Sequence, residues 1–145
     1  MTGAHLRKVW PAMRPLVYVI MPVGSDPDYP VRRARIEAAL RGLGMDGYFP
    51  LDHHPHDGDF DAAAMRFDVQ RCTVALADLT LERPSCYYEL GVAHGAGLPA
   101  VLVAAAATKI HQTADRGAVA FYHSYDELQA YVARALHRYA LAAAR

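Results

Sequence analysis

Three acidic side chains stand where they could do chemistry, and the first is Glu89. It lies in the stretch PSCYYELGVAHGAGLP (residues 84–99), within an apolar and aromatic run that is helical in pattern. An acid near a helix start gains from the helix dipole, whereas a buried carboxylate must be paired, shifted in pKa or turned toward a cavity. Glu89 is therefore either a favourable helix-end charge or a reactive group at the mouth of a pocket.

The other two acids are Asp78 and Asp68, and each has a structural alternative. Asp78 ends an apolar run and precedes Thr80, so it either caps the following turn or contacts a ligand at the end of a strand. Asp68 lies beside Phe67 and Val69 on an expected helix, where spacing alone favours a solvated face. From position alone, both interpretations of Asp78 remain possible, and nothing marks Asp68 as a site residue.

Two polar loops complete the set of candidate sites. MPVGSDPDYP (21–30) offers Gly24 and Ser25 ahead of a helix start, an arrangement that binds phosphate through backbone N–H groups. The loop DHHPHDGD (52–59) holds three histidines and three aspartates, but it lacks a zinc spacing such as HExxH. A flexible polar loop over a pocket is favoured there over a metal site. The chain contains no GxGxxG, Walker or GxSxG pattern, which removes the dinucleotide, NTPase and serine-hydrolase motifs.

The elements that must position these residues alternate between strand and helix, with short connections. Expected strands cover 16–22, 47–51, 73–79, 99–107 and, more weakly, 117–123, and expected helices cover 29–44, 60–72, 85–97 and 124–144. This order predicts an α/β fold, a flavodoxin- or Rossmann-like doubly wound parallel sheet of about five strands with helices on both faces. Ligands bind such sheets beyond the carboxyl ends of the strands, where all the candidate loops are expected to lie.

Composition limits the class of protein. We expect residues 1–15 to be an irregular lead-in and 16–145 to form a single domain. Fifteen basic and fifteen acidic side chains cancel, which argues against a nucleic acid polymer or an anionic membrane as partner, and no apolar run is long enough to span a bilayer. Cys72 and Cys86 are expected to be buried thiols of a cytoplasmic protein.

The segment VALADLTLERPSCYYELGVAHGAGLPAVLV (74–103) resembles the stretch from the third to the fourth strand of nucleoside 2-deoxyribosyltransferase-like proteins. That superfamily includes nucleoside deoxyribosyltransferases and nucleotide N-glycosidases, with TIR domains as distant relatives. The resemblance covers about residues 16–137, and its most specific part is YELG followed by a glycine and a proline. It implies that Glu89 is a nucleophile, that Tyr18 hydrogen-bonds it, and that Asp68 contacts the nucleobase.

The resemblance also implies a binding surface around these three residues. Gly24 and Ser25 would hold the 5′ side or phosphate of the substrate. Apart from the resemblance, Tyr87 or Tyr88 is expected to line the site because both are aromatic residues near Glu89. Members of the family are commonly dimers or larger, with a neighbour completing the pocket. The family's deoxyribosyltransferases carry an aspartate about six residues before the nucleophile.

This chain has Arg83 at that position, with Ser85 nearby. A cation there fits a phosphate or a larger anionic substrate better than a plain deoxyribonucleoside.

These observations predict an N-glycosidase, with hydrolysis favoured over transfer, that acts on a nucleoside or a nucleoside 5′-monophosphate. The expected mechanism uses Glu89, with Asp68 or Asp78 bonding or protonating the leaving base, and requires no metal or organic cofactor. The alternatives are a TIR-like NAD-cleaving enzyme and a catalytically silent nucleotide-binding module. We expect a homodimer or a larger homo-oligomer.

Overall fold

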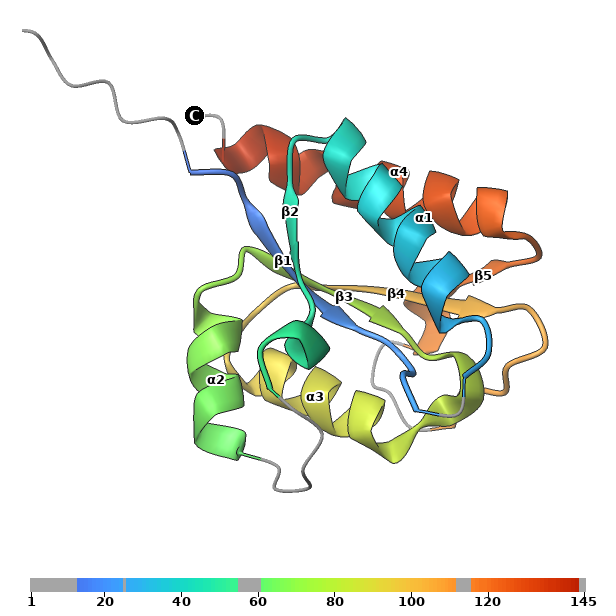
Figure 1. Cartoon of the computed structure of the whole chain (residues 1–145), viewed down its shortest axis with the longest axis horizontal. Helices are drawn as coiled ribbons and strands as arrows, with labels where there is room; N and C mark the ends of the chain where they lie inside the picture. The colour runs from blue at the N-terminus through green and yellow to red at the C-terminus, as the bar shows by residue number, and fades with distance from the viewer. Residues whose placement is uncertain (1–12, 25, 55–60, 112–115, 144–145) are drawn as a thin grey trace, which may run out of the picture.

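A computed structural model describes residues 13–24, 26–54, 61–111 and 116–143. It contains one sheet of five parallel strands in the order β2-β1-β3-β4-β5 (Figure 1). The strands are β1 (Leu16–Ile20), β2 (Asp46–Tyr48), β3 (Val74–Asp78), β4 (Ala100–Ala105) and β5 (Ala120–Tyr122). The predicted doubly wound α/β fold is confirmed.

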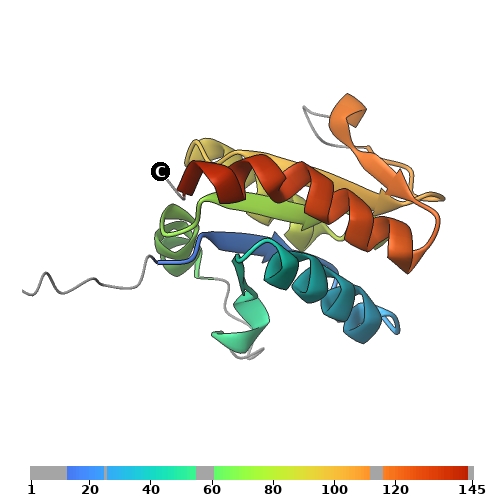
Figure 2. The ribbon, with the colours of Figure 1, turned by 90° about the horizontal axis from the view of Figure 1, so that it is seen from above.

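Two helices cover each face of this sheet. They are α1 (Tyr29–Gly42), α2 (Ala62–Gln70), α3 (Pro84–Gly95) and α4 (Tyr125–Ala143). Figure 1 shows α1 and α4 on one side of the sheet and α2 and α3 on the other, and Figure 2 shows α1 and α4 running side by side. Short 3₁₀ turns cover Pro50–Asp52, Thr80–Glu82 and Arg116–Ala118.

The apolar strands form because both of their faces are covered. Every residue of β3, VALAD, is buried, as expected for a parallel strand between two helix layers. On β1, Val17 and Val19 pack toward α1 and α4, whereas Tyr18 and Ile20 pack toward α2 and α3. This alternation is the two-residue period of a strand, and it directs Tyr18 toward the helix that carries Glu89.

Local sequence sets where the elements begin and end. The strand expected over 47–51 stops at Tyr48, because Pro50 lacks a backbone N–H for a ladder and instead starts a 3₁₀ turn. The helix expected over 60–72 begins at Ala62, where the Asp61 carboxylate accepts bonds from Ala63 N and Ala64 N, each at 3.0 Å.

Cys72 and Cys86 are buried free thiols, as predicted. Burial raises their pKa values to about 11 and about 12. Within the described ranges, none of the helices has the length and apolarity needed to cross a bilayer.

Candidate active site

Glu89 lies on α3, in the second turn rather than at the helix end. The first turn of α3 carries no acidic residue, so Glu89 is not a first-turn dipole charge. Its side chain is partly buried, and burial raises its pKa to about 7, against the effect of a hydrogen bond from Tyr18 that lowers it. Glu89 is therefore a carboxyl group that titrates near neutral pH, which is a common property of functional carboxylates.

Tyr18 supplies the donor of that bond from the middle of β1. It is 2% exposed, and its pKa is raised by burial first and then by the charges of Glu89 and of Asp68 and by Tyr48. The hydroxyl keeps its proton and serves as a donor. Tyr18 thus lies close enough to both Glu89 and Asp68 for their charges to affect its pKa.

Asp68 projects from α2 and is buried, 8% exposed, so its side chain is not on a solvated helix face. The Tyr48 hydroxyl donates to Asp68 Oδ2 at 2.7 Å, and His54 Nε2 lies 2.9 Å from the same oxygen. Burial alone would raise the Asp68 pKa, but the bonds from His54 and Tyr48 and the charge of Arg71 hold it below its ordinary value. Asp68 is an ionised acceptor and is poorly suited to protonating a leaving group.

Aromatic rings join the two carboxylates. Tyr48 stacks on Tyr18 with centroids 5.5 Å apart and planes 18° apart, and it also stacks on His53 with centroids 4.4 Å apart and planes 4° apart. The register of the sheet brings the tyrosines together, because Tyr18 of β1 is paired with Tyr48 of β2. Sequence reasoning missed Tyr48 and the roles of His53 and His54, whose only signal was a loop rich in histidine.

Asp78 ends β3 and has no exposed surface. Its Oδ1 accepts bonds from Thr80 N at 3.0 Å and Thr80 Oγ1 at 2.6 Å, and its Oδ2 accepts one from the Tyr122 hydroxyl at 2.9 Å. Burial raises the Asp78 pKa against these bonds and against the charge of Arg32. The observed contacts are those of a turn cap, and direct ligand contact by Asp78 stays a prediction.

A buried ion pair with Arg32 of α1 supports this cap. Arg32 Nη2 donates to Asp26 Oδ1 at 2.7 Å, and its Nη1 lies 3.9 Å from Asp78 Oδ2. The side chains of Arg32, Asp26 and Asp78 are 5%, 0% and 0% exposed. The pair ties the loop after β1 to the end of β3.

The structure brings the first loop and the start of α3 together. Arg83 is the N-cap residue of α3, and its Nη2 lies 3.5 Å from Gly24 O. A Cβ built on Gly24 would meet no atom within 4 Å, so there is room beside this loop. Ser85 and Tyr88 lie exposed on α3, and Ser25 is outside the described residues.

The loop between β3 and α3 contains two consecutive residues in the left-handed region, Leu81 at φ 66° and Glu82 at φ 45°. Neither is glycine, so the conformation is strained. The Glu82 carboxylate accepts bonds from the Tyr87 hydroxyl at 2.8 Å and from His111 N at 3.0 Å, and it lies 2.7 Å from His111 Nδ1. These bonds fasten the loop that leads into the Glu89 helix.

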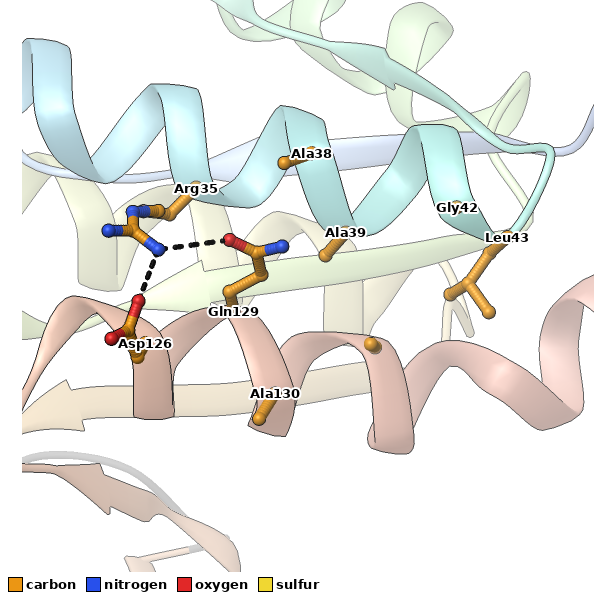
Figure 3. Close-up of a pocket in the computed structure, with 9 residues that line it drawn as sticks. Arg35, Ala38, Ala39, Gly42, Leu43, Asp126, Gln129 and Ala130 are labelled. Carbon is orange, nitrogen blue, oxygen red and sulfur yellow. Dashed lines mark hydrogen bonds and ion pairs between the residues drawn. The ribbon is translucent and has the colours of Figure 1, made fainter.

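Two grooves lie away from this cluster. One, of about 450 Å³, runs between α1 and α4, where Arg35 bonds to Asp126 and Gln129 (Figure 3). The other, of about 300 Å³, lies beside β2 and includes Arg33 and Asp52 in its lining. The α1–α4 groove is on the face of the sheet opposite Glu89, so the chemistry of the side chains rather than the size of a hollow identifies the candidate site.

No metal cluster accompanies the site in the part of the chain that the structure describes: no three His, Cys, Asp or Glu side chains gather as they would around an ion. Residues 55–60 of the histidine-rich loop lie outside that part.

Comparison with known proteins gives matches among solved structures. No protein-family model matches the chain, and no curated protein sequence matches it. A 2-deoxyribosyltransferase of Bacillus psychrosaccharolyticus aligns with a TM-score of 0.55 and 14% identity over 79% of this chain and 90% of the other. The CMP N-glycosidase BcmB of Clostridium botulinum aligns with a TM-score of 0.56 and 15% identity over 79% of this chain and 96% of the other. At these identities the likeness establishes a shared fold, and at that level it confirms the resemblance seen in the sequence.

Proposed function

We propose that this protein is an N-glycosidase that cleaves the base–sugar bond of a nucleoside or nucleoside 5′-monophosphate, with hydrolysis favoured over transfer. The observation that carries the proposal is Glu89, a partly buried carboxyl group with a pKa raised to about 7 and a bond from the Tyr18 hydroxyl. The structural neighbours, a 2-deoxyribosyltransferase and a CMP N-glycosidase, support cleavage or transfer at a base–sugar bond.

The proposed reaction begins with the ionised Glu89 carboxylate. It attacks the anomeric carbon through an oxocarbenium-like transition state and forms an ester bond to the sugar, while the carbon–nitrogen bond breaks. The electron pair of that bond leaves with the base, which takes a proton from water. The hydroxide left by that water then attacks the anomeric carbon, the ester bond breaks, and the sugar and the Glu89 carboxylate are released. Tyr18 orients the carboxylate throughout, and its hydrogen bond lowers the Glu89 pKa against the effect of burial.

The surrounding residues would bind the substrate. We assign the nucleobase to Asp68 and the 5′-phosphate to Gly24, Ser25 and Arg83, where a cation at the α3 N-cap complements an anion. Ser85 and Tyr88 would line the sugar side.

Asp78 holds the β3 loop through its bonds to Thr80 and Tyr122. Every step uses only the side chains of the protein and water.

We further propose a homodimer. Phe67 on α2 and Tyr88 on α3 expose 62% and 51% of their surface, and α2 and α3 contact each other. Burial of such aromatic residues is typical of protein–protein interfaces. Sedimentation velocity at micromolar concentration tests this, and a monomer at every concentration would contradict it.

The experiment that tests the proposed function is chromatography of free base. The purified protein is incubated with nucleosides, their 5′-monophosphates and NAD, alongside Glu89→Gln and the control Glu37→Gln on α1. We expect base release from one substrate class by the wild type and the control, and a loss of about a thousandfold or more in Glu89→Gln.

Each other outcome has a definite meaning. Equal activity of Glu89→Gln and the wild type would refute the nucleophile. Release from NAD alone would move the function to NAD cleavage, and binding without release would indicate a nucleotide-binding module.

A further inference from the structure

The geometry around Asp68 is asymmetric. Both hydrogen bonds that the described residues make to its carboxylate converge on Oδ2: the Tyr48 hydroxyl at 2.7 Å and His54 Nε2 at 2.9 Å. No described residue bonds to Oδ1, and the side chain is 12% exposed. Among the described residues, one oxygen of Asp68 is thus bonded twice and the other not at all.

The partners of Oδ2 can act only as donors. Burial, followed by the bond to Asp68, raises the Tyr48 pKa, so Tyr48 keeps its proton. An ionised carboxylate has no proton to give, so Nε2 of His54 must carry the hydrogen of the 2.9 Å bond. Tyr48 is 4% exposed and fixed between the rings of Tyr18 and His53. The two donors therefore set which oxygen faces outward.

A side chain so arranged recognises hydrogen-bond donors. We infer that His54 and Tyr48 position Asp68 as an acceptor that selects bases carrying an exocyclic amine, such as cytosine or adenine, over their carbonyl counterparts, uracil and hypoxanthine. This inference rests on the proposed function, because it places the base at Asp68 while Glu89 attacks the sugar. A carbonyl oxygen at the same place would bring its partial negative charge against the carboxylate oxygen, and the two would repel.

The two donors to Oδ2, Tyr48 and His54, lead to a specific prediction for Asp68→Asn. Where Tyr48 and His54 go on donating as they do to the carboxylate, the amide oxygen takes the Oδ2 position and the amide NH₂ faces the ligand. The acceptor becomes a donor without any change of shape. We expect this variant to reverse the preference and to bind the carbonyl bases more tightly than the amine bases.

Binding is measured by titration calorimetry in the Glu89→Gln background, so that the result does not depend on turnover. The probes are the 5′-monophosphates of cytidine and uridine, and of adenosine and inosine. We expect the amine member of each pair to bind at least about tenfold more tightly, as one hydrogen bond to a charged group implies. Adding Asp68→Asn should invert that ratio.

Two His54 variants test whether His54 acts by positioning the Asp68 carboxylate or only by supporting the fold. His54→Gln retains an N–H donor and should keep the amine preference, whereas His54→Ala should lower it by about tenfold. His54 is half exposed, 50% at the side chain, and thermal melting checks that both variants fold.

Equal affinities within each pair, or a ratio unmoved by Asp68→Asn and His54→Ala, would overturn this inference. Failure of the proposed function is a separate result, seen as absence of base release by the wild type.

Discussion

The Glu89→Gln variant should be more stable than the wild type, and its advantage in the free energy of unfolding should grow as the pH rises. The folded protein holds the Glu89 pKa at about 7, above its ordinary value of 4.5, because burial disfavours the charged form. A carboxyl group whose pKa is raised on folding contributes stability below its unfolded pKa and loses it as the pH rises through the folded value. Wild-type stability therefore carries a penalty from Glu89 that develops between about pH 4.5 and pH 7 and stays constant above it.

The size of this penalty follows from the two pKa values. Their difference, from 4.5 to about 7, corresponds to roughly 3 kcal/mol at about 1.4 kcal/mol for each pKa unit. About 2 to 3 kcal/mol of it should develop between pH 5 and pH 8. Such an amount is a large share of the stability of a small domain. Glutamine has no charge to desolvate, and its amide oxygen can still accept the bond from Tyr18.

The assay is urea unfolding of wild type and Glu89→Gln by circular dichroism across that pH range. The difference in unfolding free energy should favour the variant increasingly from pH 5 to pH 8, and all other titrating groups cancel in the difference. Glu127→Gln is the control: the backbone N–H of His123 lowers the Glu127 pKa from its ordinary value of 4.5, so Glu127 is largely ionised in both states throughout this range and its difference from wild type should change little with pH. If the difference in unfolding free energy between Glu89→Gln and wild type does not change with pH, the raised pKa of the partly buried Glu89 carboxyl group is refuted.

Three further predictions test the positions of other side chains. Tyr18→Phe removes a hydrogen bond that lowers the Glu89 pKa. The rise of kcat/KM with pH, which we expect near pH 7 in the wild type, should therefore move to higher pH. A midpoint that does not move would contradict the contact between Tyr18 and Glu89. Arg32→Leu leaves two buried carboxylates without their cation and should cost about 3–5 kcal/mol in urea unfolding, whereas a loss below about 1 kcal/mol would show that these acids are neutral or hydrated. Leu81→Gly relieves a left-handed backbone at φ 66° and should raise stability by about 0.5–1 kcal/mol, with a lower melting temperature counting against strain there.

The fold was predictable because its physical causes are local. Strands covered on both faces need unbroken apolar runs, and β3 has one that ends at Asp78, at the carboxyl edge of the sheet. The cluster around Asp68 was not predictable from spacing, because it depends on register. Tyr48 reaches Tyr18 only because β2 pairs with β1 at that position, and sequence patterning does not specify this pairing.

The loop before α3 shows a second limit of sequence reasoning. Leucine and glutamate are poor choices for left-handed backbone, where glycine or asparagine is expected. Leu81 and Glu82 adopt it nevertheless, and Glu82 is held by Tyr87 and by His111, which is 29 residues away. Contacts this distant override local preference, and a single sequence gives no sign of them.

The stacked pair Tyr18 and Tyr48 divides the site into two parts with different freedom to change. Glu89 lies on a helix, and Tyr18 lies on an inner strand that is paired on both sides, so substitutions there that change the size of the side chain disturb the core. His54 lies on a partly exposed segment after the 3₁₀ turn Pro50–Asp52. In the proposed site, exchange of this one histidine would weaken the preference between bases while Glu89 and Tyr18 stay unchanged. Under the proposed function, base preference could therefore change, by natural variation or by engineering, without substitutions at Glu89 or Tyr18.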